Sequence, residues 1–108
     1  MNKRIQKISD ILDKNKAEAI EVFNLLDKDY IVDYAVIASS RGQRHTLALL
    51  DYLKGGLKPQ EEFLHVDESD DWIVADLGDI LIHIMTPEFR VKYDIESFLT
   101  SVITDVKE

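Results

Sequence analysis

The spacing of apolar residues divides this 108-residue chain into alternating helices and strands. In residues 2–14, apolar side chains recur at helical intervals from Ile5 to Leu12, which predicts an amphipathic helix. Residues 19–26 and 30–39 are two predicted strands. The second contains the continuous apolar run of residues 34–38, which is typical of a central strand that is covered on both faces.

A second helix is predicted after residue 39. Ser40 and Gln43 have the spacing of a capping box, and a wide stripe of leucines follows up to residue 53. We expect Gly55 and Gly56 to end this helix, because glycine readily adopts the left-handed conformation found just past helix ends. Then come a linker at 58–62, a short strand at 63–66 and an acidic loop at 67–71.

The clearest pattern lies in residues 71–85, which contain two apolar strands joined by a tight acidic turn. Strand alternation predicts that Trp72, Val74 and Asp76 share one face of the sheet, whereas Asp79 lies across the turn. Thr86, Pro87 and Glu88 then have the chemistry of a helix start, with an N-cap, a first-turn proline and an acid at the positive end of the dipole. We expect this last helix to run to Leu99. Residues 100–108 form a tail that either extends the helix or frays.

The predicted order is helix, strand, strand, helix, strand, strand, strand, helix. That order indicates an α/β fold in one domain over residues 1–108, with a mixed β-sheet flanked by helices. The core of the domain is expected at about residues 8–99.

The charge balance narrows the choice of partner. The chain has 21 acidic and 13 basic residues, a formal net charge of -8. Because nucleic-acid binding depends on neutralising phosphates, we expect little direct nucleic-acid binding. A basic protein suits such a surface, although acidity also serves simple solubility. The absence of cysteine excludes disulfides and thiolate chemistry. With no signal-like or membrane-spanning apolar run, we expect a cytoplasmic protein without membrane contact.

Two carboxylates at the predicted hairpin turn offer an enzymatic interpretation. Asp76 and Asp79 could hold Mg²⁺, and residues 39–42 at a helix start could cradle a phosphate. Together these would suit phosphoryl transfer. The same residues also have an ordinary explanation as turn chemistry and a capped helix, which is commoner. On balance we expect no metal and no cofactor.

The remaining side chains of interest have both structural and functional explanations. His83 lies inside an apolar strand and is expected to be a hydrogen-bonded core residue rather than a catalyst. Arg44, followed by His45, is expected to pair with an acid on the hairpin. The single tryptophan, Trp72, is either part of the core or the centre of a protein interface, since its amphipathic ring suits both places.

At residues 71–85 the chain resembles the signature of the ribosomal silencing factor family, the Iojap-related proteins. Residues 33–39 with Arg44 and His45, and residues 88–96, resemble two further segments of that family. The resemblance covers roughly residues 8–99. Two differences stand out: residues 39–43 replace a Thr-Gly-Thr-Ser-like run, and Leu99 replaces a tryptophan.

The resemblance implies a nucleotidyltransferase-like fold that lacks the catalytic carboxylates, and therefore a protein that is not an enzyme. It implies binding to the large ribosomal subunit through ribosomal protein L-fourteen, which blocks association with the small subunit and represses translation. We expect Trp72 to be the apolar anchor of the partner-binding face, Asp76 and Asp79 to accept from lysine or arginine on the partner, and Tyr93 to contribute from the last helix. Arg44 and His45 either line the same face or brace it.

Two other hypotheses remain open at this point. One is a nucleotidyltransferase-like, Mg-dependent enzyme that uses Asp76 and Asp79. The other is a homodimeric adaptor that pairs through an exposed strand edge. The sequence does not set the oligomeric state, so a homodimer stays open.

Overall fold

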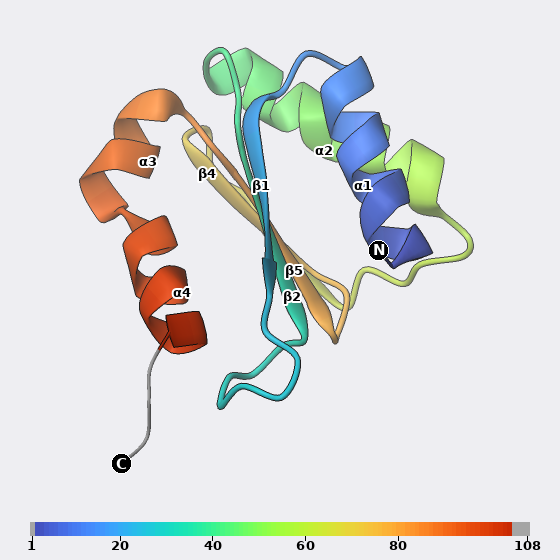
Figure 1. Cartoon of the computed structure of the whole chain (residues 1–108). Coiled ribbons are helices and arrows are strands. Elements are labelled where there is room, and N and C mark those ends of the chain that lie inside the picture. Colours follow the sequence, from blue (N-terminus) through green and yellow to red (C-terminus); the bar gives the residue numbers. More distant parts are fainter. Residues whose placement is uncertain (1, 105–108) are drawn as a thin grey trace.

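A five-stranded sheet lies between two pairs of helices in the computed structural model, which describes residues 2–104 (Figure 1). The elements in chain order are α1 (Lys3–Lys14), β1 (Glu18–Asn24), β2 (Tyr34–Ser39), α2 (Gln43–Leu57), β3 (His65–Asp67), β4 (Trp72–Asp76), β5 (Ile80–Met85), α3 (Pro87–Tyr93) and α4 (Ile95–Thr104). The predicted α/β fold with a mixed sheet is confirmed. None of the helices within residues 2–104 is long and apolar enough to cross a membrane.

The strands are arranged in the order β1-β2-β5-β4-β3. Only β2 and β5 run parallel, and the other three pairs are antiparallel. Because β2 and β5 occupy the middle of the sheet and are covered on both faces, their residues are almost all buried. The continuous apolar run at residues 34–38 therefore correctly predicted a central strand.

Two hydrophobic clusters hold the helix layers to the sheet. On one face, α1 and α2 pack through Ile5, Ile8 and Leu12 together with the leucines of α2. On the other face, α3 and α4 cover a smaller cluster that includes Met85 and Leu99. Figure 1 shows the two helix pairs on opposite sides of the strands. Side chains that alternate along a strand therefore reach different helix layers.

The start of α2 differs from the expected capping box. Its N-cap is Gly42, which makes no side-chain cap, whereas the fully buried Ser40 has its Oγ 2.6 Å from Thr46 Oγ1. The Ser40 hydroxyl also bonds the Gly42 carbonyl at 3.1 Å. The capping-box prediction was wrong because the serine lies two residues before the cap and satisfies its hydroxyl inside the core.

The end of α2 also differs, since the helix continues through both glycines to Leu57. A Cβ atom added at Gly56 would lie 2.6 Å from Ile11 Cδ1. The glycine thus permits close contact between α1 and α2 and does not end the helix. The helix ends at Leu57 because its C-cap, Lys58, precedes Pro59 and adopts the extended conformation that a following proline favours.

These two glycines make a matched prediction. A Cβ added at Gly55 would meet nothing within 4 Å, so Gly55→Ala should stabilise the fold by about 1 kcal/mol, the cost of glycine in a helix interior. Gly56→Ala should gain less, because its methyl group displaces Ile11. Urea denaturation of both variants measures the difference, and equal stabilities would contradict the close contact.

The last helical segment is divided in two. Asp94 adopts the left-handed conformation, with φ 46°, and separates α3 from α4. Thr86 is the N-cap and Pro87 the first helical residue, as predicted, but the Thr86 hydroxyl donates to Asp71 Oδ1 at 3.2 Å. The expected single helix to Leu99 was wrong, because the left-handed backbone at Asp94 divides it into α3 and α4. The tail continues α4 to Thr104, and residues 105–108 lie outside the described residues.

Smaller boundary shifts occur where polar loops meet the sheet. Residues 30–33 belong to a loop before β2 instead of the strand itself, and the short strand predicted at 63–66 forms at 65–67. β1 begins one residue early and carries an irregularity between Glu18 and Glu21.

Candidate functional site

Trp72 opens β4 and lies on the face of the sheet that α3 and α4 cover. Along β4, Ile73 and Ala75 are buried beneath α1 and α2, whereas Trp72, Val74 and Asp76 are half-buried on the opposite face. This is the alternation expected from a strand. The predicted common face of Trp72 and Asp76 is confirmed.

Trp72 and His83 form a hydrogen-bonded pair. The indole Nε1 of Trp72 donates to His83 Nδ1 at 3.1 Å. Because indole nitrogen only donates, His83 Nδ1 must accept, which places the imidazole proton on Nε2. His83 is only 8% exposed, and its burial lowers the pKa of the imidazole to about 4. The expectation of a hydrogen-bonded core histidine is confirmed.

Three aromatic rings from β4 and α3 lie next to one another. Tyr93 lies with its ring centroid 5.1 Å from Trp72 and 5.5 Å from Phe89. Phe89 and Tyr93 are four residues apart on α3, so both lie on the same side of that helix. Tyr93 remains 47% exposed. We call Trp72, Val74, Phe89 and Tyr93 the aromatic surface.

A groove of about 350 Å³ adjoins the aromatic surface. Its lining residues are Asp67, Glu68, Ser69, Trp72, Val74 and Phe89. The floor is therefore aromatic and aliphatic, while the rim carries two exposed carboxylates. The Lys92 ammonium of α3 lies 5.7 Å from the Phe89 ring centre and 5.4 Å from that of Tyr93. An apolar floor with an acidic rim suits a protein partner that presents apolar and basic side chains.

The two turn carboxylates are separated by their hydrogen bonds. Asp76 Oδ1 accepts from the Gly78 N–H at 2.7 Å, which is ordinary turn chemistry. Both oxygens of Asp79 are bound by Arg4 of α1, at 2.6 and 2.9 Å, and Arg4 also pairs with Glu61. The Arg4 hydrogen bonds hold the pKa of Asp79 below its usual range. Asp79 thus lies against the α1 layer, on the other side of the sheet from Trp72.

This arrangement bears on the magnesium hypothesis. Both Asp79 oxygens are already occupied by a cation, and Ser40 in the loop at 39–42 is buried against Thr46. Across residues 2–104, no three acidic or histidine side chains come together as a metal site would require. The geometry therefore gives no support to an enzyme that uses Asp76 and Asp79.

Arg44 and His45 belong to α2, in the helix layer on the other side of the sheet from the aromatic surface. His45 Nδ1 accepts from the Arg41 N–H and its Nε2 donates to the Asn15 carbonyl, each at 2.8 Å, so it ties α1 to the start of α2. In the described part of the chain, Arg44 makes no ion pair with the hairpin, so that prediction was wrong. Gln43 makes the contact instead, donating to Asp71 Oδ2 at 3.1 Å.

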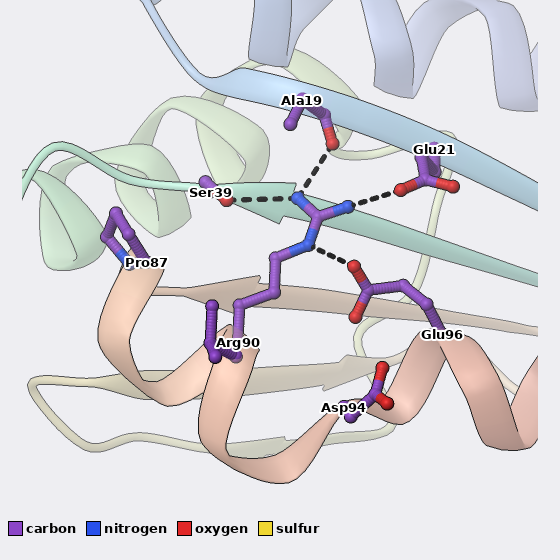
Figure 2. Close-up of a pocket in the computed structure, with 8 residues that line it drawn as sticks. Ala19, Glu21, Ser39, Pro87, Arg90, Asp94 and Glu96 are labelled. Atoms are coloured by element: carbon purple, nitrogen blue, oxygen red, sulfur yellow. Dashed lines mark hydrogen bonds and ion pairs between the residues drawn. The ribbon is translucent and has the colours of Figure 1, made fainter.

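Arg90 was not identified by sequence reasoning, although it is only 7% exposed and joins four elements (Figure 2). Its guanidinium donates to the Ala19 carbonyl at 2.7 Å, Ser39 Oγ at 3.0 Å, Glu21 Oε2 at 2.8 Å and Glu96 Oε2 at 2.7 Å. The irregularity of β1, where Ala19 has φ 49°, lies beside this arginine. The only sequence signal was a charged residue between Phe89 and Val91.

A pocket of about 470 Å³ opens beside this arginine, between β1 and the junction of α3 and α4. Glu21, Asp94 and Glu96 line it together with Pro87 and Val91. Since Arg90 is bound by two of these carboxylates, its charge is already compensated within the fold. We interpret Arg90 as the residue that fastens α3 and α4 to the sheet and so holds Phe89 and Tyr93 in place.

Comparison with known proteins shows the family to which this chain belongs. The family model described as "Ribosomal silencing factor during starvation" matches residues 1–107. The chain belongs to this ribosomal silencing factor family. A ribosomal silencing factor of Zymomonas mobilis is 35% identical over 95 residues, covering 85% of this chain and 71% of that protein. One from Haemophilus influenzae is 30% identical over 97 residues, covering 85% and 93%.

Two further comparisons extend the family in sequence and in structure. The mouse protein named "Mitochondrial assembly of ribosomal large subunit protein 1" is 29% identical over 102 residues, and the match spans 45% of its length. A crystal structure from Chromobacterium violaceum has a TM-score of 0.85 at 23% identity, covering 93% of this chain and 88% of that one. At that identity the likeness shows the fold alone. The resemblance predicted from residues 71–85 is confirmed.

Proposed function

We propose that this silencing factor binds ribosomal protein L-fourteen on the large ribosomal subunit through its aromatic surface. Occupying that site would block association with the small subunit and so repress translation in the cytoplasm. The family description supports a role in ribosome silencing, and the name of the mouse relative supports association with the large subunit. L-fourteen itself comes from the resemblance of residues 71–85 to the family signature.

The observation that carries this proposal is the partly exposed aromatic surface with its acidic rim. Tryptophan and tyrosine are enriched at the energetic centres of protein interfaces. The ring centroids of Trp72 and Tyr93 are 5.1 Å apart on this surface. Asp67 and Glu68 line the adjoining groove and Asp76 shares the sheet face of Trp72, so all three add negative charge on this side. Ribosomal proteins are generally basic, so this charge would raise the rate of association.

The proposed mechanism is steric and requires no chemistry. The sheet and Arg90 hold α3 rigid, so the aromatic surface is formed before binding and little ordering entropy is lost. We assign Asp76 to the partner-facing rim. We assign Asp79 a structural role. Its ion pair with Arg4 braces the hairpin tip, so Asp79 contributes to binding only indirectly.

Trp72→Ala should weaken binding to large subunits by about 2 kcal/mol, roughly 30-fold in Kd, the scale of an interface hot spot. Co-sedimentation of the purified variant with large subunits measures the loss. Tyr52→Ala is the matched control, because Tyr52 is an aromatic residue that is 51% exposed on α2, in the opposite layer. It should bind like the unaltered protein.

Because Trp72 also packs against His83, the folded state of each variant is checked by its urea midpoint. Tyr93→Ala provides a second variant that leaves the Trp72–His83 hydrogen bond in place, and it should weaken binding in the same direction. If the folded Trp72→Ala and Tyr93→Ala proteins co-sediment with large subunits as well as wild type does, the proposed binding surface is refuted.

A further inference from the structure

Basic and acidic residues are distributed unequally along this chain, and the basic ones are concentrated in the layer of α1 and α2. Residues 3–16 and 41–58, which contain α1 and α2, hold nine of the 13 lysines and arginines but only three of the 21 acids. Their net charge is +6, and the rest of the chain carries -14. Figure 1 shows α1 and α2 together on one side of the sheet. The net charge of the whole chain therefore conceals a basic layer.

Most cations of this layer are not neutralised by neighbouring acids. Arg4 pairs with Asp79 at 2.6 Å, and Arg41 lies 3.5 Å from Glu18. The other seven make no ion pair within residues 2–104. They are Lys3, Lys7, Lys14, Lys16, Arg44, Lys54 and Lys58. Lys54 is half-buried, and the other six are exposed and available to an anionic partner.

Three of these lysines form a row along α1. Lys3, Lys7 and Lys14 fall within about 40° of one another around the helix and extend about 16 Å along it. The buried residues of α1 lie on the other side of the helix, so the row faces away from the core. Asp10 interrupts the row, with its carboxylate accepting from Gln6 at 2.8 Å. We call Lys3, Lys7 and Lys14 the lysine row.

We propose that the basic layer binds the phosphate backbone of double-stranded RNA through the lysine row. Lys3, Lys7 and Lys14 lie along one side of α1 and present a line of positive charge to the phosphates of a duplex. α1 carries no aromatic residue on which an unpaired base could stack, which favours duplex backbone over single strands. Naming ribosomal RNA as the source of the duplex rests on the proposed function.

The basic layer and the aromatic surface lie on opposite sides of the sheet, so one partner does not exclude the other. If the aromatic surface contacts a ribosomal protein while the basic layer contacts RNA of the same subunit, the two contacts together raise the overall affinity for that subunit. This revises the expectation of little nucleic-acid binding, which was based on the net charge of the whole chain.

Fluorescence anisotropy with a labelled RNA duplex of about 20 base pairs in dilute salt tests the proposal. Lys7→Glu and Lys28→Glu change the net charge equally, but Lys28 lies in the β1–β2 loop, outside the basic layer. Lys7→Glu should raise the Kd about fivefold and the Lys7→Glu/Lys14→Glu pair at least tenfold, with a shallower dependence on salt. Lys28→Glu should change the Kd less than twofold.

Lys7→Gln/Lys14→Gln serves as a milder pair if charge reversal disturbs α1, and urea midpoints confirm folding. Equal weakening by Lys7→Glu and Lys28→Glu would overturn the proposal, as would absence of duplex binding by the unaltered protein. Binding to phosphatidylglycerol vesicles but not to the duplex would also overturn it. Trp72→Ala should bind the duplex normally, so failure here and failure of the proposed function are distinguishable.

Discussion

Arg90→Ala should lower the free energy of unfolding by about 3–5 kcal/mol, the usual cost of removing one partner from a buried ion pair. The substitution takes away four hydrogen bonds and leaves Glu96 facing the protein interior without its cation. The Ala19 carbonyl and the Ser39 hydroxyl also lose their donor. Since Arg90 fastens α3 and α4 to β1 and β2, the C-terminal helices should be the first part of the fold to loosen.

Urea denaturation followed by the fluorescence of the single tryptophan measures this loss. Arg41→Ala is the control, because Arg41 is exposed and its one ion pair, with Glu18, is 3.5 Å long. An exposed pair of this kind is worth about 1 kcal/mol or less. Arg90→Lys keeps the charge but not the planar fork, so its stability should fall between those of wild type and Arg90→Ala. A loss below about 1 kcal/mol for Arg90→Ala would contradict the assigned role.

Acidification should destabilise the protein through His83. The folded-state pKa of this imidazole is about 4, against 6.5 for an unperturbed histidine. Above pH 6.5 both states are neutral and His83 contributes nothing to the pH dependence. Between pH 6.5 and 4 the unfolded chain binds a proton that the folded chain refuses, so stability falls by about 1.4 kcal/mol per pH unit. The accumulated loss is about 3 kcal/mol, and below pH 4 this contribution levels off.

The measurement is the free energy of unfolding at intervals from pH 7 to pH 4. His83→Gln should lack this contribution and lose about 3 kcal/mol less than wild type over the range, whereas His65→Gln, at a largely exposed position, should follow wild type. Protonation also places an N–H on His83 opposite the indole N–H of Trp72, so tryptophan fluorescence should change in the same window. If the free energy of unfolding falls equally with pH for wild type and His83→Gln, the conclusion that His83 is buried as a neutral imidazole is contradicted.

Local pattern predicted the parts of the molecule that depend on local rules. Strand alternation correctly placed Trp72 and Asp76 on one face, and the apolar run at residues 34–38 correctly indicated a central strand. The apolar surroundings of His83 correctly predicted burial. In each case the side chain's environment depends on residues within a few positions in the chain, which is the information that periodicity carries.

The parts that were missed depend on contacts between distant segments. Arg4 and Asp79 are 75 residues apart, and Arg90 binds the Ala19 carbonyl 71 residues away. Gly56 continues a helix because Ile11 of another helix lies against it. The break at Asp94 uses an aspartate where glycine is the usual signal. None of these pairings leaves a periodic trace in a single sequence.

The central claim is that this silencing factor occupies the large subunit and prevents the small subunit from joining. Sedimentation of mixed large and small ribosomal subunits, with and without saturating protein, tests it most directly. We expect the whole-ribosome peak to disappear, the free subunits to remain, and the protein to migrate with the large subunit, while Trp72→Ala leaves the whole-ribosome peak in place. Undiminished formation of whole ribosomes at saturating wild-type protein would contradict the account.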